Sequence, residues 1–110
     1  MMTLAMSPAS LGLLRALAAR AGVPRDRILL TEWTSTDWQS LTFVGERHEA
    51  RIRITGADAP DAASRLVTGI EDAELNVSGH VVADIRLWNG GEAPAGGSVL
   101  LRLEALTVEE

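Results

Sequence analysis

The chain has 110 residues, a formal net charge of −5, ten basic residues that are all arginine, and no cysteine. The negative charge argues against a general affinity for nucleic acids or anionic membranes, because both depend on excess positive charge. The missing lysine and cysteine exclude Schiff-base chemistry, thiol nucleophiles and thiolate metal ligands. A chain of this length, 46% hydrophobic, can bury a core without disulfides, so we expect a single domain over residues 1–110.

Arginine without lysine, together with abundant alanine and glycine, is typical of a GC-rich bacterial genome. A signal peptide is not expected, because Arg15 and Arg20 interrupt the N-terminal apolar run and no positively charged segment precedes it. No apolar run reaches the roughly 18 residues that a membrane span needs. The sequence therefore predicts a bacterial protein of the cytoplasm that does not enter a membrane.

The first predicted element is a helix over residues 9–21. Ser7 is a favourable N-cap, Pro8 suits the first helical position, and Gly22 is a favourable C-terminal cap. The residues before it, 1–6, are predicted to form a disordered tail or a short edge strand.

Three strands are predicted next, over residues 27–33, 38–44 and 48–55. The polar run 34–37 is interpreted as a turn, and residues 45–47 as a hairpin loop in which Gly45 adopts a positive φ. After this loop, one apolar phase contains His48, Ala50, Ile52 and Ile54. Such a period of two is typical of a strand with one covered face.

A second helix is predicted from about Asp58 or Asp61 to about Ile70, followed by a strand over 74–88 with a bend at residues 78–79. We expect Val81, Ala83, Ile85 and Leu87 to share one face of that strand. The glycine-rich segment 89–97 is interpreted as a flexible connection. In the last strand, 98–108, we expect Val99, Leu101 and Leu103 to be buried and the phase to switch near Ala105.

The order helix, three strands, helix, two strands predicts an α+β fold. We expect a two-layer sandwich, with a mostly antiparallel sheet of about five strands and two helices on one face. A ferredoxin-like variant is an alternative if residues 2–6 supply an additional first strand. Both halves consist of a helix followed by strands, which is compatible with an internal duplication.

The two histidines are the first candidates for chemistry. If their strands are neighbours, His48 and His80 could bind a metal together with Asp84 or Glu49. Their spacing is not that of a tight metal motif, and histidines at strand ends more often bond to backbone carbonyls. Ser35, Ser40 and Ser98 have no nucleophile-elbow context. We therefore predict no catalytic residue, no metal and no cofactor.

The aromatic residues are the second set of candidates. The chain contains only four: Trp33, Trp38, Phe43 and Trp88. All three tryptophans fall near predicted strand ends, where large rings close the rim of a small core or form a ligand pocket or a protein contact. With His48 and His80, these four residues make up the predicted ligand or interface set.

The sequence favours a non-catalytic interaction or assembly domain, since a small sheet must protect its edges and symmetric pairing is a common solution. We expect a homodimer with Trp33, Trp38 or Trp88 at or near the contact, and a further protein partner is compatible with this function. The alternative is a small-molecule-binding protein or enzyme with an apolar pocket lined by the four aromatic residues and polar at His48 or His80. Nucleic-acid binding is least favoured, although Arg47, Arg51 and Arg53 could form a local patch.

Overall fold

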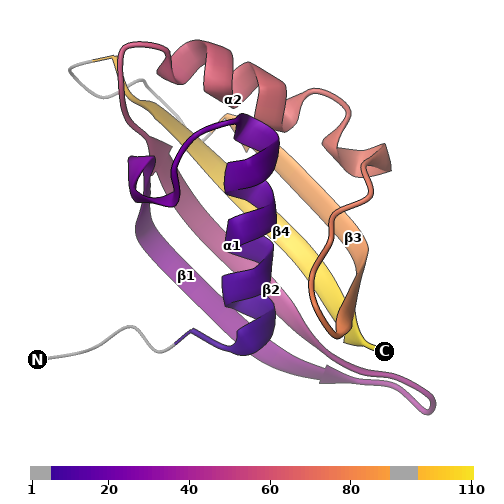
Figure 1. Ribbon diagram of the computed structural model, residues 1–110. Helices are drawn as coiled ribbons and strands as arrows, with labels where there is room; N and C mark the ends of the chain where they lie inside the picture. Colours follow the sequence, from indigo (N-terminus) through magenta and orange to yellow (C-terminus); the bar gives the residue numbers. More distant parts are fainter. Residues whose placement is uncertain (1–5, 90–96) are drawn as a thin grey trace, which may run out of the picture.

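The computed structural model describes residues 6–89 and 97–110 (Figure 1). These residues form a four-stranded antiparallel sheet with two α-helices on one face, so the predicted α+β class is confirmed with fewer strands than expected. The elements in chain order are α1 (Pro8–Ala21), η1 (Arg25–Arg27), β1 (Ile28–Gln39), β2 (Val44–Ile54), α2 (Ala59–Val67), η2 (Ile70–Asp72), β3 (His80–Asn89) and β4 (Val99–Glu109).

The strands lie in the order β1-β2-β4-β3, and every neighbouring pair is antiparallel. Each half of the described chain is a helix followed by a hairpin, and β2 and β4 meet at the centre of the sheet. This is the strand order that two α-β-β units would have if a two-fold axis between β2 and β4 related them. The ferredoxin-like alternative depends on a strand at residues 2–6, of which 2–5 lie outside the described residues.

Helix α1 begins and ends close to its predicted limits. The Ser7 hydroxyl accepts a hydrogen bond from the Ser10 backbone N–H at 3.1 Å, and Gly22 ends the helix with a φ of 72°. Leu13, Leu14 and Leu17 are fully buried against the sheet. This leucine face holds α1 in the core. Figure 1 shows α1 lying across one face of the sheet.

Helix α2 is shorter than predicted. It ends at Val67, because Gly69 adopts a left-handed conformation with a φ of 71°, and Ile70 begins the separate turn η2. Ala62, Leu66 and Ile70 are nonetheless all buried, as their spacing predicts.

The prediction of two separate strands over 27–44 is wrong, because β1 runs without a break from Ile28 to Gln39. The polar run 34–37, interpreted as a turn, pairs residue by residue with 46–49 of β2. Since β1 is an edge strand, its polar side chains stay in water while its backbone pairs on the inner side. The β-branched Thr34 and Thr36 suit such a position.

The predicted hairpin loop at residues 45–47 is also wrong. The chain reverses at Leu41 and Thr42, where the Ser40 N–H donates to the Phe43 carbonyl at 2.9 Å and the Phe43 N–H donates to the Ser40 hydroxyl at 3.1 Å. Gly45 lies inside β2 and does not have a positive φ. A Cβ at Gly45 would lie 2.0 Å from the Thr107 carbonyl oxygen. Glycine is therefore required here for the close approach of β2 to β4.

Strand β3 begins at His80, after a turn in which Gly79 has a φ of 74°, and not at residue 74 as predicted. The register with β4 shifts between Val82 and Asp84, which marks a bulge. The bulge separates the residues predicted to share a face: Val81 is exposed, whereas Ile85 and Leu87 are buried in the core.

Strand β4 keeps one phase along its length, so the predicted switch near Ala105 is wrong. Leu101, Leu103 and Ala105 are buried under the helices, and Thr107 continues the same face. Leu106 and Val108 therefore lie on the opposite face. Of the predicted connection 89–97, residues 90–96 lie outside the described residues.

Candidate functional site

The sheet face opposite the two helices, here called the open face, carries side chains in rows that cross the strands. The pairing registers define these rows in the order β1, β2, β4, β3. From one end to the other they are Trp38, Gly45, Val108 and Val81; then Thr36, Arg47, Leu106 and Asp84; then Thr34, Glu49, Glu104 and Arg86; then Glu32, Arg51, Arg102 and Trp88; and last Leu29, Arg53 and Leu100.

One end of the open face is apolar. A shallow concavity of about 450 Å³ lies there. Its apolar lining, here called the apolar end, consists of Trp38, Phe43, Val81, Ala83, Leu106 and Val108. Phe43 is 55% exposed and Val81 is 51% exposed, although both are large apolar side chains. Glu109 and Glu110 complete the lining.

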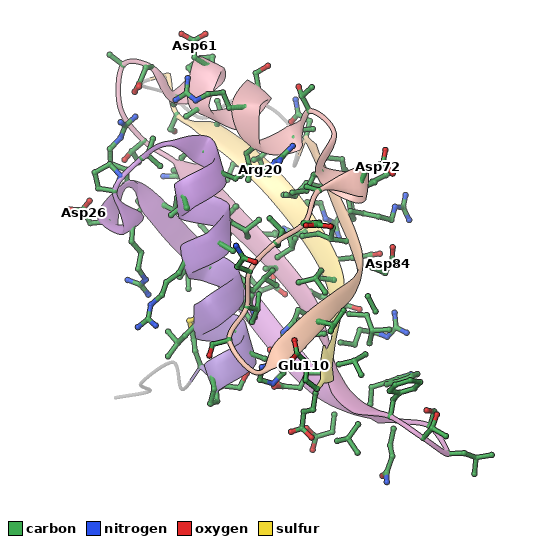
Figure 2. All side chains as sticks on the ribbon, turned by 45° about the vertical axis from the view of Figure 1, so that its right-hand side comes forward. Arg20, Asp26, Asp61, Asp72, Asp84 and Glu110 are labelled. Carbon is green, nitrogen blue, oxygen red and sulfur yellow. The ribbon has the colours of Figure 1, made fainter. Side chains whose placement is uncertain are left out.

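The β1–β2 hairpin continues past this end of the sheet. Its last residues, including the exposed Leu41 and Val44, have no pairing residues in β4. Figure 2 shows the hairpin tip projecting beyond the other strands, with Glu110 at the same end of the molecule. Apolar side chains are therefore exposed on the protruding tip as well as in the concavity, with Phe43 belonging to the concavity and Val44 to the opposite face of the hairpin.

The middle of the open face is charged. Glu49 lies opposite Glu104, and in the next row Arg51 lies opposite Arg102. The described residues contain one ion pair on this face, between Arg51 Nε and Glu32 Oε2 at 3.8 Å. Trp88 is flanked by the guanidinium groups of Arg86 and Arg102, 5.4 and 5.7 Å from its ring centroid. The arrangement is that of a solvated surface with weak pairwise interactions.

A second polar cluster lies under α1, on the covered face. His48 is fully buried, and its Nδ1 lies 2.8 Å from the Ser35 Oγ and 3.4 Å from the Ser10 Oγ. Its Nε2 lies 2.8 Å from the Thr107 Oγ1. The Ser10 hydroxyl is also 2.8 Å from that of Ser35 and 2.9 Å from that of Ser7. The imidazole thus bridges α1, β1, β2 and β4.

One set of proton positions satisfies this cluster with a neutral imidazole. Ser35 donates to Nδ1 of His48, and Nε2–H donates to Thr107, whose hydroxyl is 3.5 Å from the Glu46 carbonyl oxygen. Burial lowers the pKa of His48 below its usual 6.5, and this effect exceeds the opposing influence of Glu46. The ring is therefore neutral at neutral pH.

The Ser35–His48 contact resembles a nucleophile with its base, but its chemistry favours a structural role. A lowered pKa makes His48 a weaker base. The Ser35 oxygen also accepts a hydrogen bond from the Trp33 indole N–H at 3.2 Å, which reduces its nucleophilicity. The concavities found among the described residues include neither side chain in their linings.

The second histidine does not join the first. His80 Nδ1–H donates to the Ser78 carbonyl oxygen at 2.9 Å, and β4 lies between His80 and His48 in the sheet. His80 acts on His48 only through a minor electrostatic effect that lowers the pKa of His48. Within residues 6–89 and 97–110, acidic and histidine side chains do not gather in a group of three or more that could hold a metal.

The four aromatic residues occupy separate places. Trp33 is 8% exposed and packs edge-on against the His48 ring, with centroids 6.1 Å apart, on the covered face. Trp38 and Phe43 belong to the apolar end, whereas Trp88 lies three rows away. The predicted pocket lined by all four is therefore not formed.

Sequence reasoning missed most of the apolar end. The predictions place Val81 in the core and a phase switch at Leu106 and Val108. The available signal is an apolar residue in the outward phase of β1, β4 and β3. The partners of His48 on α1 and β4, Ser10 and Thr107, lacked any signal, because only the tertiary fold brings them together.

Comparisons with protein-family models, with curated proteins and with solved structures found no match to this chain. Among the described residues, the helices are too short or too polar to cross a membrane.

Proposed function

We propose that the protein is a non-catalytic assembly domain that forms a homodimer through the apolar end. The observation that carries this proposal is the apolar concavity of the open face, to which the exposed Phe43 and Val81 contribute. An exposed apolar patch of this kind on a small domain marks a contact site, since its burial is favourable at about 25 cal/mol per Å².

The shape of this end favours a second copy as the occupant. A two-fold axis along the row from Trp38 to Val81 would set the two apolar ends face to face, with each hairpin extending over β1 and β2 of the partner. In the next row inward, Arg47 would face the partner's Phe43, which precedes β2, and Leu106 would face the partner's Glu110, which follows β4. An aromatic ring and a carboxylate are both favourable neighbours for the guanidinium of Arg47.

The charged rows argue against pairing over the whole open face. A two-fold axis parallel to the strands would set Glu49 against the partner's Glu104 and Arg51 against the partner's Arg102, because β2 would lie over β4. Like charges in direct opposition are unfavourable. Overlap at the apolar end alone buries the apolar side chains and keeps the charged rows of the two copies apart.

Light scattering after size-exclusion chromatography tests the proposal with two matched variants. Val81→Asp places a carboxylate in the apolar end, whereas Leu29→Asp makes the same kind of change at the opposite end of the same face, where Leu29 is 44% exposed. We expect the wild type and Leu29→Asp to have twice the chain mass at micromolar concentration. Val81→Asp should raise the dimer dissociation constant at least about tenfold, which corresponds to about 1.4 kcal/mol.

A monomeric wild type at high micromolar concentration would contradict the proposal. Equal weakening by both aspartates would also contradict it, because the contact would then not be confined to the apolar end. Circular dichroism spectra that match the wild type will show that neither variant has lost its fold.

A further inference from the structure

The His48 cluster connects the start of α1 to the centre of the sheet. The cap residue Ser7 contacts Ser10, Ser10 contacts both Ser35 and His48, and His48 contacts Thr107. Ser10, His48 and Thr107 are each fully buried. Ser7 is half-buried and Ser35 is exposed on the edge strand, so the chain of contacts leads from the surface into the apolar core and fixes where the first turn of α1 docks.

We propose that His48 is an acid-sensitive latch, whose neutral imidazole holds the first turn of α1 on the sheet and whose protonation loosens that turn. The proposal concerns the covered face and does not depend on the proposed dimer. Its basis is the hydrogen-bond geometry around the ring.

Protonation changes what Ser35 must do. The Ser35 oxygen accepts from the Trp33 N–H, and in the neutral state its own proton goes to His48 Nδ1. An imidazolium donates from both nitrogens, so Ser35 must accept from His48 and turn its own proton towards Ser10 or, because Ser35 is exposed, towards water. Ser10 likewise can only accept from the charged ring, and its own proton then turns towards Ser7, whose hydroxyl also accepts the Ser10 backbone N–H that caps α1. Protonation therefore changes the hydrogen bonds between the ring and the first turn of α1.

The charged form also lacks a carboxylate in contact. The groups that α1, β1 and β4 bring to the ring are uncharged: Ser10, Ser35, Trp33 and Thr107. The charged or titratable groups that act on it are Glu46 on its own strand, which favours the imidazolium, and His80 on β3, which opposes it. Burial outweighs both and lowers the pKa of His48.

The direction of the pH effect follows from this lowered pKa. When α1 is loosened and the ring reaches water, His48 takes up a proton near pH 6.5, earlier than it does in the closed state. The stabilisation by the latch is therefore complete above pH 6.5 and is lost as the pH falls towards the lower pKa of the closed state. In that pH window, the equilibrium constant for opening of the first turn of α1 should rise by up to about tenfold for each unit by which the pH falls. This is the limit for uptake of one proton.

Amide hydrogen exchange and NMR titration of the whole chain from about pH 7.5 to about pH 5 test the latch. The Ser10 and Leu11 amides, which bond to the side chain and backbone of Ser7, should lose protection as the pH falls, after correction for intrinsic exchange. The His48 ring signals should titrate below 6.5 over the same pH range. His80→Gln should keep this response, because His80 contributes only a minor effect.

His48→Gln provides the decisive variant, since a glutamine amide can accept and donate in place of the two ring nitrogens and carries no titrating charge. We expect its Ser10 and Leu11 protection to be independent of pH over the same range. If His48→Gln does not fold, the wild type and His80→Gln still test the latch. In both, the His48 ring should titrate over the same pH range in which the Ser10 and Leu11 amides lose protection.

Three results would overturn the latch: constant protection of the first turn across the range, a full pH response in folded His48→Gln, or a ring midpoint at or above 6.5. Repeating the titration on Val81→Asp will keep the result separate from any change in assembly.

Discussion

Gly45 shows how a single residue can determine the geometry of the central strand pair. Its missing side chain admits the Thr107 carbonyl oxygen, and the next residue along β4, Val108, lies directly opposite it in the register. The same position lies in the outermost row of the apolar end, beside Trp38. One glycine thus serves both the packing of β2 on β4 and the shape of the exposed surface.

Gly45→Ala should destabilise the fold, because a Cβ would overlap backbone atoms that cannot move independently. We expect a loss of about 1–3 kcal/mol in the free energy of unfolding, measured with urea. Gly79→Ala is the control, since Gly79 has a φ of 74° but no atoms within 4 Å of its built Cβ. A smaller loss in Gly45→Ala than in Gly79→Ala would mean that crowding at β4 is not the reason for glycine.

At the scale of elements, the attachment of α1 depends on an apolar and a polar contribution. Leu13, Leu14 and Leu17 bury its inner face, and the serines of its first turn connect it to His48. The leucines provide most of the stabilising free energy, since burial of each is worth about 1.5–3 kcal/mol. The serines specify the position of the helix start.

Ser7→Ala removes the cap of α1 and the outermost link of the His48 cluster. We expect it to lower the free energy of unfolding by about 1 kcal/mol, as is usual for loss of a serine cap. Ser64→Ala, at an exposed position on α2, should change it by less than about 0.5 kcal/mol. Equal unfolding midpoints for wild type and Ser7→Ala in urea would contradict the role of this cap.

Local patterns predicted the helices and the alternating strands well, because caps and hydrophobic periodicity act within a few residues. They failed at the polar run 34–37 and at Gly45, where the conformation is set by pairing with distant strands. The bulge after Val82 could not be predicted either. One extra residue in a strand exchanges the inward and outward side chains that follow it, and the residue types of the strand give no sign of this. His48 was assigned to the buried phase correctly, but its partners come from three other elements.

For the whole molecule, the separation of its two sheet faces is the main feature. The covered face contains the leucine-rich core and the His48 cluster, whereas the open face divides into charged rows and the apolar end. The helices leave the apolar end uncovered, and the hairpin extends past it (Figure 2). A second copy would bury this end without bringing the charged rows together.

The most direct test of this account is the formation of a disulfide across the proposed two-fold axis, which is well suited to a chain without native cysteine. Val108→Cys places the thiol in the row along the proposed axis. Leu100→Cys places it on the same strand and the same face, at the end of the sheet away from the apolar end. Under mild oxidation at micromolar concentration, we predict that Val108→Cys becomes a covalent dimer on non-reducing gels at least tenfold faster than Leu100→Cys. Equal rates for the two variants, or no covalent dimer of Val108→Cys, would contradict assembly through the apolar end.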